Sequence, residues 1–335
     1  MLINIDLDVI NSEEQFRLLD RLLMLFENDQ HEWYLEDKLE DVMQCGWPSQ
    51  LSNRHQNILK TIVEKSFSRS GWVTKPEKRD RGIVKITLEG ESSLENVLKG
   101  IDGPLFIVVE NETSDTLFLN RLFEIYPSHG KTLSKALESS FLEYYPAGGR
   151  NETIKTIKNI SNKKKAPHVP RIFVFVDSDK KFPGQEHDST LQEIVDFCSE
   201  QNIPIHILYK REIENYIPKE VLQKRIPAQL SRVTEEFFNL TADQWDFFDL
   251  EKGFNGQQPN NNDPLYSNYS TRRDQKYENL RKGFSGERAV FRPKQELYTF
   301  VQDEEFNAKN VNIRCAHQPD RDELLNLLLR IKNKL

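Results

Sequence analysis

The sequence has few cysteines, no long apolar run and no excess of positive charge. Its three cysteines, Cys45, Cys198 and Cys315, are spaced too widely for a metal motif, so we expect free thiols in a reducing cytoplasm. No apolar run has the length of a membrane helix, and the N-terminus lacks the basic-then-apolar order of a signal peptide. We therefore predict a cytoplasmic protein without a membrane partner. The net charge of −7 argues against a generally basic nucleic-acid binder, but it permits local basic patches.

Several sequence patterns of known function are also missing. We find no internal repeat, no Gly-x-x-x-x-Gly-Lys-Ser/Thr phosphate loop, no Ser-His-Asp arrangement and no metal-binding set of histidines. Hydrophobic residues make up 37% of the 335 residues and aromatic residues 10%. This composition supports a folded core, and the length suits one large domain or two ordinary ones.

The chain changes texture twice. The beginning combines an amphipathic helix over residues 12–28 with an alternating strand over residues 82–90. The end is more polar and mainly helical, with an Asn- and Pro-rich loop at 255–270 and a closing amphipathic helix at 322–335. We predict an N-terminal α+β region, a catalytic domain and a mainly helical C-terminal domain at residues 1–103, 104–220 and 221–335.

The middle region alternates strands and helices. The predicted strands cover residues 104–110, 141–149, 171–179 and 203–210. The predicted helices between them cover residues 116–126, 151–161 and 189–201. Nearly unbroken apolar strands that alternate with helices of this length indicate a parallel sheet covered on both faces. The predicted fold class is therefore α/β.

Carboxylates follow three of the four predicted strands. Glu110 follows the first strand, Asp177 and Asp179 follow the third, and Glu212 and Glu214 follow the fourth. Because ligands of open parallel sheets bind beyond the carboxyl ends of the strands, we expect these side chains to share one site. Carboxylates that converge repel one another, at a cost of about 1.4 kcal/mol per unit of pKa shift, and a hard divalent cation removes this cost. We predict two Mg²⁺ or Mn²⁺ ions about 4 Å apart, which suit phosphodiester cleavage.

Each acidic position also has a simpler explanation. A single Asp after a strand is usually the N-cap of the next helix, and Glu112 or Asp115 has the same option after the first strand. Glu212 and Glu214 fit a solvated run of charge. We favour the metal site because the acidic residues occur together, each at a strand end of one α/β unit.

Four stretches together resemble a TOPRIM domain, the acidic fold shared by topoisomerases, primases and OLD nucleases: FIVVENETSDTLFL, YYPAGGRNETIK, FVFVDSDKKF and REIENYIP. The resemblance covers roughly residues 104–220. The last stretch is most similar to stand-alone OLD-type TOPRIM nucleases of bacterial anti-phage systems. The resemblance implies a Rossmann-like core and an Mg²⁺-dependent endonuclease activity. Since the phosphate loop is missing, it also implies that any ATPase is a separate partner subunit.

The resemblance assigns a role to each acidic position. It implies that Glu110 acts as general base or metal ligand and that Asp177 and Asp179 bind metal. Glu214 matches a later acidic position of the nucleases best, and Glu212 matches it second. The implied catalytic set is therefore Glu110, Asp177, Asp179 and Glu214, with Glu212 as an additional metal ligand.

One further feature supports the resemblance and another departs from it. Gly148 and Gly149 fit the family's glycine turn, where backbone without Cβ approaches the site closely. The usual Gly after the first acidic residue is Asn111 here, which leaves open whether Glu110 or Glu112 is the catalytic acid. We favour Glu110 because it is directly in register with the strand end.

Basic residues near the predicted site are candidates for contacts with nucleic acid, whose phosphates need cations. They are Arg150, Lys155, Lys180, Lys181 and Arg211. A second basic stretch, interleaved with aromatic residues, covers residues 272–294. Each stretch alone also fits a solvated surface.

The sequence leaves three functions open. The first is a two-metal nuclease that cleaves DNA or RNA as an effector of anti-phage defence, acting as a homodimer or within a larger complex. The second is a nucleotide-sugar glycosyltransferase, because Asp177 and Asp179 also resemble the Asp-x-Asp of those enzymes, which need no counterpart of Glu110. The third is a non-catalytic regulatory or binding subunit.

Overall fold

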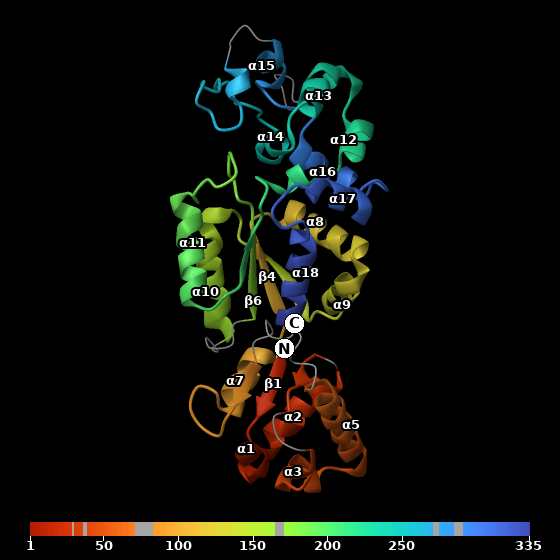
Figure 1. Ribbon diagram of the computed structural model, residues 1–335. Coiled ribbons are helices and arrows are strands. Elements are labelled where there is room, and N and C mark those ends of the chain that lie inside the picture. The colour runs from red at the N-terminus through yellow and green to blue at the C-terminus, as the bar shows by residue number, and fades with distance from the viewer. Residues whose placement is uncertain (29, 36–38, 71–82, 165–170, 271–274, 285–290) are drawn as a thin grey trace.

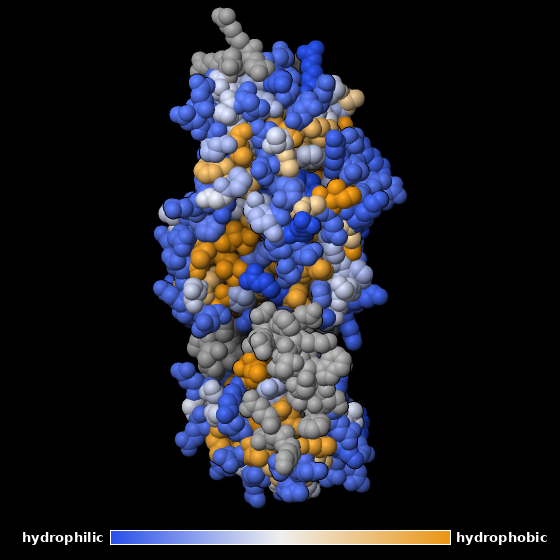
Figure 2. Space-filling view, viewed as in Figure 1, coloured by the Kyte–Doolittle hydropathy of each residue, from blue (hydrophilic) through white to orange (hydrophobic). Residues whose placement is uncertain are grey.

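The computed structural model describes residues 1–28, 30–35, 39–70, 83–164, 171–270, 275–284 and 291–335. These residues form an elongated molecule of three stacked parts (Figure 1): an N-terminal lobe, a central α/β part and a helical C-terminal part. The first and last residues lie together between the N-terminal lobe and the central part, because the last helix returns to the central sheet. Figure 2 shows hydrophilic residues over most of one face of the molecule, with hydrophobic residues in separate patches.

The N-terminal lobe has its own small sheet and core. Strand β1 (Leu2–Ile5) lies between β2 (Glu32–Trp33) and β3 (Ile83–Ile86) and pairs parallel with both. The predicted helix and strand are confirmed as α2 and β3, whereas β1 and β2 are too short to stand out in the sequence. The described α-helices of the lobe are α1 Leu7–Asn11, α2 Phe16–Glu27, α3 Leu39–Met43, α4 Gly46–Gln50, α5 Asn53–Ser70 and α7 Leu94–Ile101.

The central sheet confirms the predicted parallel α/β architecture. Its four strands are β4 Leu105–Val109, β5 Leu142–Pro146, β6 Ile172–Val176 and β7 Ile205–Ile207. They pair in the order β5-β4-β6-β7, and all pairs are parallel. β7 is shorter than predicted: the N–H of Leu208 still donates to the backbone oxygen of Val176 in β6, but those of Tyr209 and Lys210 donate to the side chains of Glu323 and Tyr216.

Helices connect these strands on both sides of the sheet. α8 (Glu112–Ile125) and α9 (Pro127–Glu138) lead from β4 to β5, α10 (Thr153–Lys164) leads to β6, and α11 (Ser189–Glu200) leads to β7. The sequence analysis predicts all of them except α9. This helix packs so closely on the end of α8 that a Cβ at Gly130 would clash with the backbone oxygen of Phe123.

Alternate side chains of the strands enter different cores, as the period of two in a β-strand requires. Ile107 and Phe175 join the core with α8, α9 and the C-terminal part. Val108 and Val174 join the core with α10 and α11. The sheet is therefore buried on both faces, as the apolar strands predict.

The C-terminal part is mainly helical, as predicted, but it does not form a separate core. Its last helix, α18, packs against α8 and α9. The buried hydrophobic residues of the C-terminal part belong to the same core cluster as the side chains on one face of the sheet. The loop at 255–270 is confirmed and contains only the short 3₁₀ turn Ser267–Tyr269. The α-helices described in this part are α12 Lys219–Arg225, α13 Ser231–Phe238, α14 Ala242–Phe247, α15 Gln275–Leu280, α16 Pro293–Val301, α17 Ala308–Cys315 and α18 Glu323–Lys334.

Among the described residues, none of the helices combines the length and the apolarity that crossing a bilayer would require.

Candidate functional site

Glu110 and Asp177 lie side by side where the strand order of the central sheet reverses. β4 and β6 are neighbours, yet the chain visits β5, on the other side of β4, before it reaches β6. A crevice opens beyond the carboxyl ends of the strands at such a switch point. Glu110 follows β4 and Asp177 follows β6, and the backbone N–H of Asp177 donates to Oε1 of Glu110 at 3.2 Å. The fold thus brings the first two predicted residues into direct contact.

Further carboxylates surround this pair. Asp115, in the first turn of α8, and Glu214, in the 3₁₀ turn Ile213–Tyr216, line the same pocket of about 550 Å³ as Glu110 and Asp177. Both additional side chains are buried. The sequence analysis treats Asp115 only as a possible helix cap. Its side chain does accept the backbone N–H of Asn111, at 2.9 Å, so it serves the helix and also adds charge to the pocket.

The crowding of negative charge perturbs the carboxyl groups. Burial raises the pKa of Asp177 well above its ordinary value, and the nearby carboxylates, Asp115 foremost, raise it further. Burial also raises the pKa of Glu110. Oδ1 of Asp177 is buried and has no hydrogen-bond partner within the described part of the chain. A buried carboxylate oxygen in this state is costly, so the site favours a proton or a cation.

Arg150 supplies positive charge at this site. Its guanidinium lies 3.3 Å from Glu110, 2.8 Å from Asp179 and 3.1 Å from Asp188, and it also donates to the backbone oxygen of Asp177 at 2.9 Å. Only 10% of the Arg150 side chain is exposed. The arginine that we predict to contact nucleic acid is therefore committed to carboxylates in this arrangement, and a contact with phosphate requires these pairs to exchange.

The backbone on both sides of the site has unusual conformations. Gly149 has a φ of 120° and donates its N–H to the backbone oxygen of Glu110 at 3.1 Å, which directs the following Arg150 towards the acidic residues. Asp179 has a φ of 52°, in the left-handed region that non-glycine residues seldom adopt. Its N–H donates to the backbone oxygen of Arg211 at 3.0 Å, which holds this conformation.

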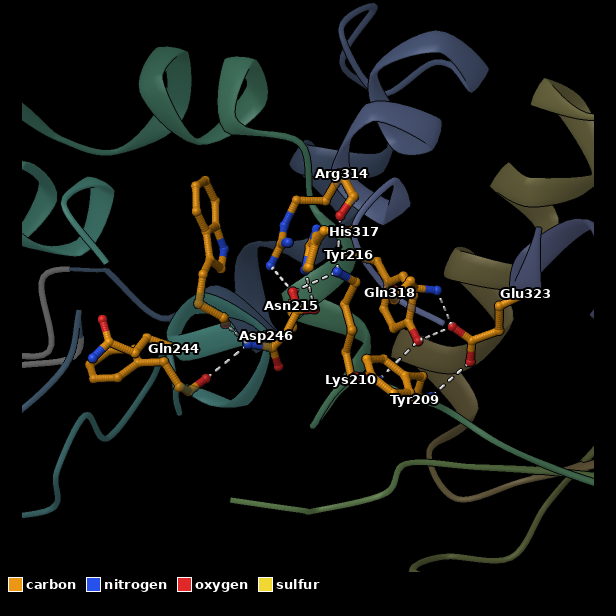
Figure 3. Close-up of polar contacts among 12 residues, drawn as sticks. Tyr209, Lys210, Asn215, Tyr216, Gln244, Asp246, Arg314, His317, Gln318 and Glu323 are labelled. Atoms are coloured by element: carbon orange, nitrogen blue, oxygen red, sulfur yellow. Dashed lines mark hydrogen bonds and ion pairs between the residues drawn. The ribbon is translucent and has the colours of Figure 1, made fainter. Parts of the chain in front are cut away.

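The C-terminal part fixes the segment that carries Glu212 and Glu214. Figure 3 shows two buried polar groups beside this segment, one centred on Glu323 and one on Asp246. Glu323 accepts hydrogen bonds from the backbone N–H of Tyr209 at 2.7 Å and from the hydroxyl of Tyr216 at 2.6 Å. The two ends of the segment are thereby tied to the first turn of α18.

The second polar group is a cluster of charges without exposure to solvent at its centre. Asp246 is fully buried and lies 2.5 Å from Lys210, 2.6 Å from Arg314 and 2.7 Å from His317. Burial, reinforced by the charge of Arg314, lowers the pKa of Lys210 to about 8. This cluster lies next to the site, because the backbone oxygen of Asp246 accepts the N–H of Arg211 at 3.0 Å.

The donor set fits a hard divalent cation, because its side chains offer only carboxylate oxygens, and Oδ1 of Asp177 is buried without a partner among the residues that the structure describes. In the present arrangement, no three His, Cys, Asp or Glu side chains of the described residues are grouped closely enough to hold an ion. The guanidinium of Arg150 pairs with both Glu110 and Asp179 and balances their charge in this arrangement.

The other predicted nucleic-acid contacts differ in their surroundings. Lys155 is exposed and pairs with Glu152 at 2.9 Å. Lys180 and Lys181 follow Asp179 directly, and the side chain of Lys181 is exposed. Arg211 is 17% exposed and pairs with Asp249 at 3.2 Å. Part of the second basic stretch, residues 272–274 and 285–290, lies outside the described residues.

Comparison with protein-family models, with curated proteins and with solved structures finds no match to this chain.

Proposed function

We propose that the chain is a metal-dependent nuclease of the TOPRIM type that hydrolyses phosphodiester bonds of DNA or RNA. The observation that carries this proposal is the contact between Glu110 and Asp177 at the switch point, inside a pocket that Asp115 and Glu214 also line. Buried carboxylates in this number need positive charge, and the phosphate of a nucleic acid needs it as well. A site for divalent ions serves both requirements.

Four carboxylates of the acidic pocket are the proposed ligands of the ion. Glu110, Asp115, Asp177 and Glu214 are the carboxylates that would hold it, since they line one pocket. When bound, Mg²⁺ or Mn²⁺ would neutralise the phosphodiester and polarise it for attack by water. Glu110 is also suited to take a proton from that water, because burial raises its pKa above the ordinary value of a glutamate.

Asp179 and Arg150 have a different place in the proposal. Asp179 is 44% exposed and pairs with Arg150. Arg150 holds the charge balance of the resting site, and its release from Asp179 would free one carboxylate for an ion and one guanidinium for a phosphate. Such an exchange suits an effector that stays inactive until a trigger acts, and a separate ATPase subunit is the partner that we propose for that trigger.

The position of Glu110 favours a nuclease over a glycosyltransferase. An Asp-x-Asp site for a nucleotide sugar needs Asp177 and Asp179 but has no use for an acidic residue after β4. Here Glu110 is 19% exposed and in contact with Asp177 and Arg150. A purely structural role in a binding subunit does not account for the buried oxygen of Asp177 that has no partner among the described residues, because an uncompensated buried carboxylate is destabilising.

The experiment is cleavage of plasmid DNA and of structured RNA by the purified chain with Mg²⁺, with Mn²⁺ and with chelator, beside Glu110→Gln and Asp177→Asn. We expect cleavage that depends on metal and on both residues. Because a latent effector can be silent alone, the assay is repeated after co-expression with the neighbouring genes. Cleavage by both variants at the wild-type rate would refute the assignment.

A further inference from the structure

A second pocket lies beside the loop that follows Asp179. It has a volume of about 470 Å³ and is lined by Lys181 and Phe182 from that loop, by Arg211, and by residues 247–266 of the C-terminal part. The same two segments of the chain contribute to both pockets: Asp177 lines the acidic pocket and Lys181 the second one, and Ile213 lines the acidic pocket and Arg211 the second one. A group bound here is therefore adjacent to the proposed site of phosphodiester cleavage.

Aromatic rings and amides dominate the lining of this second pocket. Phe182 is half-buried, and its ring stacks on no other aromatic ring or cation of the described residues. Phe254 is also half-buried, and its ring contacts those of Phe248, Tyr266, Tyr269 and Tyr277, the last of them stacked on it at 5.7 Å. Asn255 and Gln257 add exposed side-chain amides. Such a lining suits a flat aromatic ring that carries hydrogen-bonding groups at its edge.

The charges of the pocket do not suit a phosphate as the main ligand. Arg211 is neutralised by Asp249 at 3.2 Å, and Asp263 lines the pocket as a second carboxylate. Lys181 and Lys252 remain as exposed cations at its margin. A phosphate would therefore pair with Lys181 or Lys252 beside the pocket, and the interior of the pocket suits an uncharged group.

The wall formed by the 255–270 loop is held by hydrogen bonds. The side chain of Gln244 donates to the backbone oxygen of Leu265 at 2.6 Å and to the side chain of Asn268 at 3.0 Å. The hydroxyl of Tyr266 donates to the backbone oxygen of Gln244 at 2.6 Å. Because Gln244 belongs to the same short helix as Asp246, this wall is joined to the buried charges of Figure 3 and to Arg211. The pocket is thus preformed, which lowers the entropic cost of binding.

We propose that this pocket, which we call the base pocket, binds the base of an unpaired nucleotide next to the scissile phosphate. The inference rests on the proposed nuclease function and specifies its substrate: a nucleic acid that is single-stranded, or that has an extruded nucleotide, at the cleavage point. Enzymes that read one base take it out of the stack and hold it between aromatic side chains. Phe182 is the stacking residue, and Lys181 contacts the adjoining backbone.

The test is binding rather than cleavage, so that it is independent of catalysis. Fluorescence anisotropy in chelator compares single-stranded DNA and RNA oligonucleotides with blunt duplexes of the same sequence, for wild type and for Phe182→Ala. We expect the substitution to weaken single-strand binding roughly tenfold and to leave duplex binding unchanged, since stacking needs an exposed base face. Phe182→Trp should retain the affinity, whereas Phe182→Leu, which keeps an apolar side chain but removes the ring, should lose most of it.

Tyr298→Ala is the matched control, because this ring is 52% exposed on α16 and lies outside the base pocket. Circular dichroism verifies the fold of each variant. Equal affinity of Phe182→Ala and wild type for single strands would overturn the inference, as would tight binding of a nucleotide sugar without binding of oligonucleotides. Binding that depends on Phe182 without any cleavage would leave the base pocket standing and reject the nuclease. Cleavage of single strands and duplexes alike, unaffected by Phe182→Ala, would do the reverse.

Discussion

The side chain of Glu110 accepts a hydrogen bond from the backbone N–H of Asp177 at 3.2 Å, although 67 positions separate the two residues in the sequence. The bond joins the carboxyl ends of β4 and β6. Any change of the Glu110 carboxylate therefore affects the ends of both strands. Substitution by the isosteric amide is the most informative, because it removes the charge and keeps an oxygen that can accept this hydrogen bond.

Replacing either carboxylate of this pair should abolish metal-dependent cleavage. We expect Glu110→Gln and Asp177→Asn each to lower the cleavage rate by at least about 100-fold, because both carry charge that an ion requires and Glu110 also has the proton-accepting role. Glutamine keeps an oxygen for the N–H of Asp177, so the fold should persist. The measurement is the single-turnover rate at saturating Mg²⁺.

Glu112→Gln separates the two acids at the end of β4. Glu112 is exposed in the first turn of α8, whereas Glu110 is mostly buried. We expect Glu112→Gln to retain most of the activity. A loss as large as that of Glu110→Gln would move the catalytic assignment to Glu112.

Removing the charge of Asp177 should stabilise the metal-free protein. The carboxylate is surrounded by like charges and its Oδ1 has no partner among the described residues, so we expect Asp177→Asn to raise the free energy of unfolding by about 1 kcal/mol in chelator. Urea titration measures the change. Asp196→Asn, an exposed position on α11, is the control and should have little effect. A destabilisation by Asp177→Asn would show that the carboxylate has a structural role in the metal-free state.

Asp246 should be among the most sensitive positions for stability. It is the shared partner of Lys210, Arg314 and His317, and its removal leaves buried cations without compensation. We expect Asp246→Ala to cost about 3–5 kcal/mol in urea-induced unfolding. Asp243→Ala, exposed on the same helix, should cost far less. If the two substitutions proved equivalent, the cluster would be energetically neutral.

The stability of the N-terminal lobe should fall in mild acid because of His31. This side chain is 3% exposed, its Nε2 lies 3.2 Å from the backbone oxygen of Ile101, and burial, followed by nearby positive charge such as Arg171, lowers its pKa well below 6.5. The folded state keeps the ring neutral while the unfolded chain protonates near pH 6.5. The stabilisation is therefore fully present above this pH and is lost as the pH falls towards the lower pKa of the folded state, by about 1.4 kcal/mol per unit.

His31→Gln keeps a donor for Ile101 and removes the titration. Unfolding free energies at several values between pH 5 and 8 should decline towards acid more steeply for wild type than for this variant. His55→Gln, at an exposed position of α5, should follow the wild-type curve. Parallel curves for wild type and His31→Gln would contradict the prediction.

The central sheet and its acidic edge could be predicted because their signals are local. Runs such as Ile172–Val176 are apolar throughout, and Asp177 follows without a break. Parallel pairing then places strand ends together whatever the connections contain. The same reasoning predicts one site for Glu110, Asp177, Asp179, Glu212 and Glu214, and the structure places Glu110, Asp177 and Glu214 in the lining of one pocket, without Asp179 and Glu212.

What the sequence could not supply depends on contacts between distant elements. Arg150 reads as a surface residue after a glycine turn, and its ion pairs exist only because β5 lies beside β4. Asp115 has the pattern of a helix cap, and only the depth of the pocket shows its second contribution. The backbone N–H of Tyr209 donates to the side chain of Glu323, 114 positions later, and no local pattern in the sequence indicates this contact.

The hydrogen bonds of Glu323 have a consequence for protein synthesis. They fix Tyr209 and Tyr216, on either side of Glu212 and Glu214. During translation this clamp forms only after α18 has been synthesised, because its residue belongs to that helix. A nascent chain thus carries an incomplete acidic pocket, and the cell meets the finished one only after α18 has left the ribosome.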